Sequence, residues 1–120
     1  MKFTPLKQAN ACIITLPKEM LMTETPTLRA AILKQINSGI TRLIMDLHQV
    51  EFIDSSGLSV LISAMKKAHQ EGGEVVLLSP SDGVRALIEL TRLHQIFHIY
   101  ESQSAAIDYI CGPLSAIKDQ

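Results

Sequence analysis

The sequence contains little of what metal and redox chemistry require. It has no tryptophan, only three phenylalanines and two tyrosines, and two cysteines among 120 residues. Cys12 and Cys111 are far apart and lie in apolar surroundings, so we expect both to be reduced thiols. The four histidines show neither HxH nor HExxH spacing. The sequence therefore predicts no metal site and no cofactor.

Strong charge of either sign is also missing. Eleven basic residues stand against twelve acidic ones, so no basic field is available for nucleic acid or an anionic membrane. Apolar residues make up 47% of the chain but form only short runs, which predicts a globular protein without a transmembrane helix. The N-terminal MKFTPLKQ lacks the apolar core of a signal peptide, and we expect a cytoplasmic protein.

Patterns that indicate catalysis are absent as well. A nucleophile elbow needs a glycine two residues before its serine, and neither Ser55 nor Ser56 has one. No histidine stands at a triad spacing from these serines. Gly72-Gly73 precedes an apolar strand pattern instead of a helix, so we interpret it as a turn and not as a phosphate loop. We therefore predict no catalytic residues and no enzyme.

The apolar pattern alternates between strand and helix signatures. Pro5 limits the first eight residues to an edge strand at most. Further strands are predicted at 11–16, 40–47, 74–78 and 96–99, and helices at 25–38, 55–71, 83–90 and 102–110. This order predicts an α/β fold with a mixed four- to five-stranded sheet, about four helices and parallel later strands. We expect one domain over 1–120, with its core at about 10–112 and a tail at 113–120.

Local signals refine this outline. Thr25 is predicted to cap its helix ahead of Pro26, and Gly39 to end it. Ser81 and Ser102 are predicted to cap the last two helices, and Gly112-Pro113 to end the final one. Val50 and Phe52 alternate in a short segment, so both are predicted to point inward. Two groups of apolar residues have no clear place in the core, namely Met20, Leu21 and Met22 in a connection and Val60 and Ala64 on a helix flank.

The corner Asp54-Ser55-Ser56-Gly57 is the most informative stretch. Asp and Ser are preferred N-cap residues, but one of them is enough for a cap. Gly57 in the first helical turn lowers helix propensity by ~1 kcal/mol relative to alanine, so we expect something to approach it closely. The residues themselves leave both capping alone and a functional site open.

The stretch IMDLHQVEFIDSSGLSVLISAMKKAHQEGGEVVLLSP resembles the signature of STAS domains, specifically of anti-sigma factor antagonists. In that family a strand ends in D-L, and F-x-D-S-S/T-G-L-G then opens a helix. LPKEMLMTETPTLR and VRALIELTRLHQIF resemble further motifs of the family, so the resemblance spans roughly residues 10–110.

The resemblance implies a phosphorylation switch. Ser55 corresponds to the phosphorylated serine of the family, Ser56 is the second candidate, and Asp54 would position Ser55 and contact the partner. The kinase would be an anti-sigma factor of the GHKL ATP-binding class, and a PP2C-type phosphatase would reverse the modification. We predict a partner-binding surface that comprises Asp54, Ser55, Ser56, Gly57, Val60, Ala64, Met20 and Leu21.

Some positions depart from the family pattern. Lys18 and Leu21 replace a glycine and an aspartate of a loop beside the partner face, Arg92 replaces a turn glycine, and Ser59 replaces a glycine after the D-S-S-G-L motif. The sequence therefore does not identify the partner or the regulated process. The alternative function is a constitutive STAS interaction subunit of a transporter or of a multiprotein signalling complex, which would bind without a covalent switch.

Overall fold

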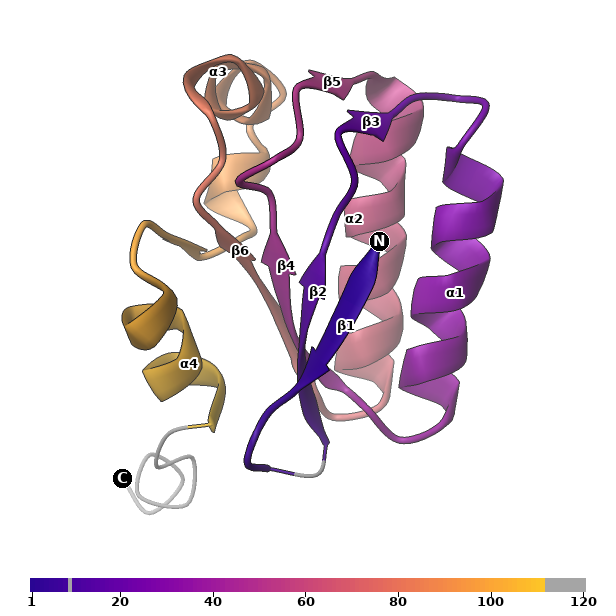
Figure 1. Cartoon of the computed structure of the whole chain (residues 1–120), viewed down its shortest axis with the longest axis vertical. Helices are drawn as coiled ribbons and strands as arrows, with labels where there is room; N and C mark the ends of the chain where they lie inside the picture. The colour runs from indigo at the N-terminus through magenta and orange to yellow at the C-terminus, as the bar shows by residue number, and fades with distance from the viewer. Residues whose placement is uncertain (9, 112–120) are drawn as a thin grey trace.

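A five-stranded sheet forms the centre of the computed structural model, which describes residues 1–8 and 10–111 (Figure 1). Its strands, in spatial order, are β1 (Lys2–Pro5), β2 (Ala11–Thr15), β4 (Arg42–Asp46), β6 (Glu74–Leu78) and β7 (Ile99–Tyr100). β1 is antiparallel to β2, and every other neighbouring pair is parallel. The structure thus confirms the mixed sheet, the parallel later strands and the edge strand that contains Pro5. Two short strands, β3 (Glu19–Met20) and β5 (Phe52–Ile53), form a separate parallel pair.

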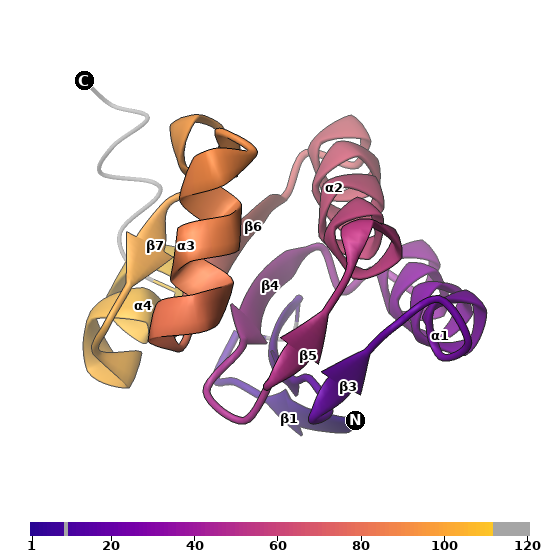
Figure 2. The same ribbon diagram turned by 90° about the horizontal axis from the view of Figure 1, so that it is seen from above.

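Helices cover both faces of the sheet (Figure 2). They are α1 (Thr25–Asn37), α2 (Ser55–Gln70), α3 (Asp82–Leu90) and α4 (Gln103–Cys111), with a short 3-10 helix η1 (Leu93–Gln95) after α3. α1 and α2 lie side by side over one face, and α4 packs on β4 and β6 from the other. None of the helices within the described ranges is long and apolar enough to cross a membrane.

Side chains alternate along the strands and build two cores. Ile14 and Met45 belong to the larger core, under α1 and α2, which also takes in Val84 and Ile88 of α3. Ile13, Ile44 and Val76 belong to the smaller core, under α4. All five residues of β4 are buried, as its continuous apolar run predicts for a strand that is covered on both faces.

The structure corrects three local predictions. The N-cap of α1 is Glu24, because Thr25 already lies inside the helix and its hydroxyl donates to the Met22 carbonyl. The strand expected at 96–99 is displaced to Ile99–Tyr100, since residues 93–97 form η1 and a following turn whose N–H groups bond to Leu93. Phe52 is 50% exposed although Val50 is buried.

Other local predictions are confirmed. Gly39 ends α1 with φ +105°, a conformation that glycine adopts without strain. The Ser81 hydroxyl accepts the Val84 N–H at 3.4 Å and caps α3, and the Ser102 hydroxyl accepts the Ala105 N–H at 3.3 Å at the start of α4. The predicted stop at Gly112-Pro113 and the tail lie outside the described residues.

Candidate functional site

The Asp54–Gly57 corner lies at the carboxyl edge of the parallel strands. β3 and β5 run side by side at this edge, and β5 leads directly into the first turn of α2 (Figure 2). Open α/β sheets place their functional loops at this edge, because the strand-to-helix connections converge there. The fold thus brings together the two segments from which the sequence predicted a docking surface.

Asp54 is the N-cap of α2 and also ties two segments together. Its backbone is extended, with φ −114° and ψ −172°, and its Oδ1 accepts the Gly57 N–H at 3.0 Å. Its Oδ2 accepts the N–H of Met22 at 3.0 Å. Both carboxylate oxygens are therefore engaged within the chain, which fixes the loop after β3 against the start of α2.

The two serines differ in exposure. Ser55 is the first residue of α2 and is exposed, and its hydroxyl makes no hydrogen bond to any part of the chain that the structure describes. Ser56 is half-buried, and its carbonyl accepts the Ser59 hydroxyl at 2.8 Å. Since Asp54 supplies the cap, capping does not account for the hydroxyl of Ser55.

Gly57 is required by the packing of the chain on itself. A Cβ atom at this position would lie 2.4 Å from the Met20 carbonyl oxygen and 2.6 Å from Ile53 Cγ1. The expectation of a close approach at Gly57 is confirmed, and the approaching group is the backbone of β3. No partner is needed to explain this glycine.

Besides Gly57, three residues of the predicted docking surface are buried. Met20 has no exposed surface, and Val60 and Ala64 are each 1% exposed, so these three side chains offer no surface to a partner in this structure. β3 covers the first turn of α2, and α1 packs along that helix, so all three join the larger core. Leu21 is half-buried and stays at the edge of the corner.

Two apolar side chains are exposed beside the corner, one in the Met20–Met22 connection and the other, Phe52, predicted from the sequence to point inward. Met22 is 68% exposed and Phe52 is 50% exposed. Phe52 also borders a hollow of about 280 Å³ between β5 and α3, lined by Leu21, Glu51, Phe52, Ile53, Gly83, Val84 and Leu87. Met22 follows two other apolar residues in a short connection, and this was the only signal in the sequence that could have indicated it.

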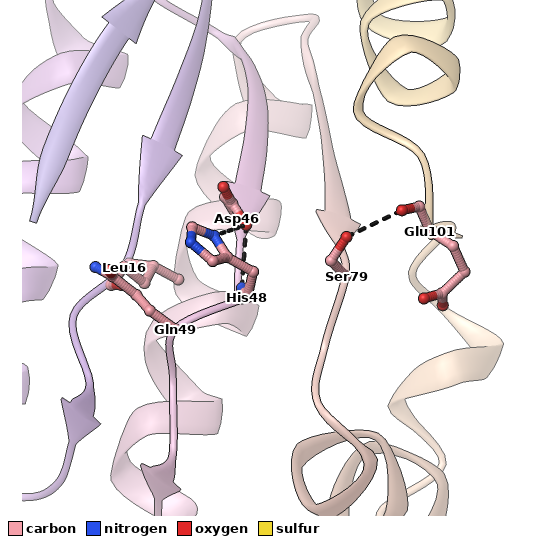
Figure 3. A network of polar contacts seen from close by, with 6 residues as sticks. All are labelled: Leu16, Asp46, His48, Gln49, Ser79 and Glu101. Atoms are coloured by element: carbon pink, nitrogen blue, oxygen red, sulfur yellow. Dashed lines mark hydrogen bonds and ion pairs between the residues drawn. The ribbon is translucent and has the colours of Figure 1, made fainter.

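Polar contacts hold the neighbouring loops at the same edge (Figure 3). Asp46 Oδ1 accepts the His48 N–H at 3.0 Å and lies 2.9 Å from His48 Nδ1. Gln49 donates to the Leu16 carbonyl, and Ser79 donates to the Glu101 carbonyl. These contacts fix the turns after β2, β4 and β6. Across residues 1–8 and 10–111, no three His, Cys, Asp or Glu side chains come together as metal ligands.

Comparison with known proteins agrees with this geometry. The family model of the STAS domain matches residues 3–106. A Thermotoga maritima protein that is provisionally named an anti-sigma factor antagonist is 30% identical over 108 residues, which cover 88% of this chain and 96% of that protein.

Solved structures show the same fold. The anti-sigma factor antagonist SpoIIAA in its unphosphorylated form has a TM-score of 0.79 at 24% identity and covers 91% of this chain and 96% of its own. The phosphorylated form of SpoIIAA, a cell fate determinant of Bacillus, has a TM-score of 0.71 at 22% identity, with coverages of 91% and 99%. A sulfate transporter family protein from Wolinella succinogenes has a TM-score of 0.74 at 15% identity, with coverages of 99% and 93%. At these identities the structures show the fold alone.

The relatives named as antagonists are regulators, in agreement with the prediction that the chain is not an enzyme. The family match covers more than half of the sequence and includes the Asp54–Gly57 corner. The chain belongs to the STAS domain family, and relatives about 30% identical to it over most of its length are named as anti-sigma factor antagonists.

Proposed function

We propose that this protein is an anti-sigma factor antagonist that is switched by phosphorylation of Ser55. When unphosphorylated, it binds an anti-sigma factor with serine kinase activity of the GHKL type, and phosphorylation releases it. A PP2C-type phosphatase restores the binding form. The observation that carries the proposal is the exposed hydroxyl of Ser55 beside a cap that Asp54 already supplies.

The fold is suited to carry a phosphate at this position. A phosphoserine brings a charge of about −1.5 to −2 at neutral pH. The first N–H groups of a helix and its dipole favour negative charge, so a phosphate on the first residue of α2 does not oppose folding. The two forms of SpoIIAA, whose overall folds both resemble this chain, support this expectation.

Binding of a partner is expected to respond differently. The phosphate would lie next to the Asp54 carboxylate, and a partner that covers the corner must remove both charges from water. A cost of only ~3 kcal/mol lowers affinity by roughly a hundredfold. The switch therefore acts by electrostatics at the interface and requires no change of fold.

We infer that the docking surface differs from the one predicted from sequence. It retains Asp54, Ser55, Ser56 and Leu21, and it gains the exposed side chains of Met22 and Phe52. Gly57 contributes only through the shape of the corner, because its Cα is packed against Met20. Ser56 stays the second candidate for phosphorylation, and its partial burial makes it less accessible to a kinase.

The test compares partners captured by variants of the chain in its own host. Tagged wild type and Ser55→Ala should both retain an ATP-binding kinase, whereas Ser55→Asp should lose it while its melting temperature stays unchanged. In a mixture of the purified kinase, ATP and the protein, one phosphate should appear on the wild type and none on Ser55→Ala. The control is Ser104→Asp, which adds the same charge to an exposed serine in the first turn of α4, on the opposite face of the sheet.

Label that remains on Ser55→Ala, or kinase binding that survives Ser55→Asp, would contradict the proposal. If the captured partner is instead a transporter subunit that both Ser55 variants bind equally, the constitutive interaction subunit is the correct function. The fold does not decide between these functions, because the Wolinella succinogenes transporter family protein shares it.

A further inference from the structure

A side-chain hydrogen bond joins α1 to the start of α2 next to the proposed phosphorylation site. Arg29 Nη2 donates to the Ser59 hydroxyl at 2.7 Å, and that hydroxyl donates to the Ser56 carbonyl at 2.8 Å. Arg29 is half-buried, and its guanidinium is therefore held in a defined place against the first turns of α2.

Helix geometry places this guanidinium close to Ser55. Ser59 follows Ser55 by four residues and Ser56 by three, so their side chains share one strip of the helix surface, with Cβ atoms about 5–6 Å apart. Side chains of a helix tilt toward its N-terminus, and the Ser59 hydroxyl does so by bonding to Ser56. Arg29 thus lies about one turn from the hydroxyl that would carry the phosphate.

We propose that Arg29 is the intramolecular receptor of the phosphoryl group on Ser55, an inference that rests on the proposed function. The bond to Ser59 uses one of the five N–H donors of the guanidinium. A phosphoserine adds three acceptor oxygens, and the planar guanidinium matches them with paired, charge-assisted bonds. Arg29 then exchanges a neutral hydroxyl for a dianion.

Because Arg29 changes its partner, phosphorylation alters the position and pairing of a positive charge as well as adding a negative one. In the unphosphorylated protein the Arg29 charge is bonded to a neutral group and stays available at the edge of the docking surface. After phosphorylation the same charge is paired within the chain, and the phosphate is fixed in one orientation. A partner therefore meets a changed arrangement of both charges. Ser59 sets the resting position of Arg29, which gives a role to a residue that departs from the family glycine.

The experiment places phosphoserine at position 55 by genetic encoding, so that no kinase is needed. The second pKa of a phosphoserine is about 6, and a neighbouring cation lowers it because it favours the dianion. Titration followed by phosphorus NMR should give a pKa lower in the otherwise wild-type protein than in Arg29→Gln, by about 0.5 unit or more. Ser59→Ala should keep the low value, because it removes only the resting partner of Arg29.

The matched control is Lys34→Gln, which removes an exposed cation from the last turn of α1 and should leave the pKa unchanged. A second measurement needs no substitution at Arg29. The Nε–H resonance of Arg29 in the phosphorylated protein should shift from its position in the unphosphorylated protein, and its exchange with water should slow. Equal pKa values in wild type and Arg29→Gln, or an unmoved Arg29 resonance, would overturn the inference.

These outcomes are independent of the kinase. If the encoded phosphoserine engages Arg29 but no kinase modifies Ser55, the receptor is present and the proposed function fails. If a kinase modifies Ser55 and Arg29 does not respond, the proposed function stands and the receptor role is wrong.

Discussion

The Asp54 carboxylate caps α2 and also accepts the backbone N–H of Met22, which lies 32 residues earlier in the chain. Oδ1 holds the Gly57 N–H and Oδ2 holds the Met22 N–H, each at 3.0 Å. We expect Asp54→Ala to lower the free energy of unfolding by about 1–2 kcal/mol, mainly through the lost cap. Urea denaturation measures this loss, and hydrogen exchange of the Met22 and Gly57 amides should accelerate together.

Asp54→Asn provides the comparison for the cap. Asparagine is an effective N-cap residue, and one oxygen can still accept the Gly57 N–H, so most of the stability should remain. Its side-chain nitrogen cannot accept the Met22 N–H, and exchange at Met22 alone should accelerate. Equal exchange at Met22 in all three proteins would show that the tie to the β3 loop does not persist in solution.

Gly57 and Gly83 should respond to alanine with opposite signs. Both lie in the first turn of a helix, but a Cβ at Gly57 meets Met20 and Ile53, whereas a Cβ at Gly83 meets nothing within 4 Å. We expect Gly57→Ala to destabilise the protein by about 1–3 kcal/mol through overpacking. Gly83→Ala should stabilise it by about 0.4–1 kcal/mol. The melting temperatures of the two variants, compared with that of the wild type, test this prediction. A Gly57→Ala variant that is more stable than the wild type would contradict the packing of β3 on α2.

Met22 and Phe52 should matter for binding and hardly for stability. Truncating an exposed aromatic or methionine side chain leaves the core intact. Truncating a well-packed interface side chain can weaken the free energy of binding by about 2 kcal/mol, which lowers affinity about thirtyfold. Titration calorimetry of Phe52→Ala and Met22→Ala with the captured partner tests this. Leu90→Ala is the control, because Leu90 is 81% exposed at the far end of α3. Equal affinities for all three variants would exclude these side chains from the docking surface.

Tyr109 should make stability depend on alkaline pH. Its hydroxyl donates to Glu74 at 2.6 Å, and this hydrogen bond, followed by burial and the Glu74 charge, raises the pKa of Tyr109 to about 12. The protonated phenol is the form that the fold favours. Its contribution is therefore complete below pH about 10, the pKa of an unfolded tyrosine, and is lost as the pH rises toward 12.

The measurement is urea denaturation between pH 8 and pH 11. Wild type should exceed Tyr109→Phe by about 1 kcal/mol at pH 8, and the difference should shrink as the pH rises. Tyr100→Phe, which leaves the bond to Glu74 in place, is the comparison. A difference that stays constant over this range would show that Tyr109 does not donate to Glu74.

The sequence predicted the order of elements because each carries its own local signal. The buried run of β4, the apolar face of α2 and the glycine at the end of α1 act within a few residues, and all three agree with the structure. The cap at Asp54 was one of several candidates, and only the structure assigns it.

The docking surface was harder to predict because burial depends on distant segments. Val60 and Ala64 are on the flank of an isolated α2, and α1 turns that flank into core. Phe52 stands two residues after the buried Val50, so alternation predicts that it is buried too. The side chain of Phe52 stays exposed because β5 pairs with β3 outside the main sheet. Met20 and Met22 differ by two positions, and β3 buries one of them against Gly57.

The packing of Met20 on Gly57 limits how segments can be exchanged between related proteins, in evolution or by design. Residues 18–22 and 52–57 are separate in the gene but are joined by backbone contact and by the Asp54 carboxylate. If one segment is replaced without the other, either a side chain at position 57 clashes with Met20, or the Met22 N–H loses the Asp54 carboxylate as its acceptor. Specificity for a new regulator should therefore transfer only when both segments are transplanted as one cassette, and chimaeras of α2 alone should lose stability before they gain a new partner.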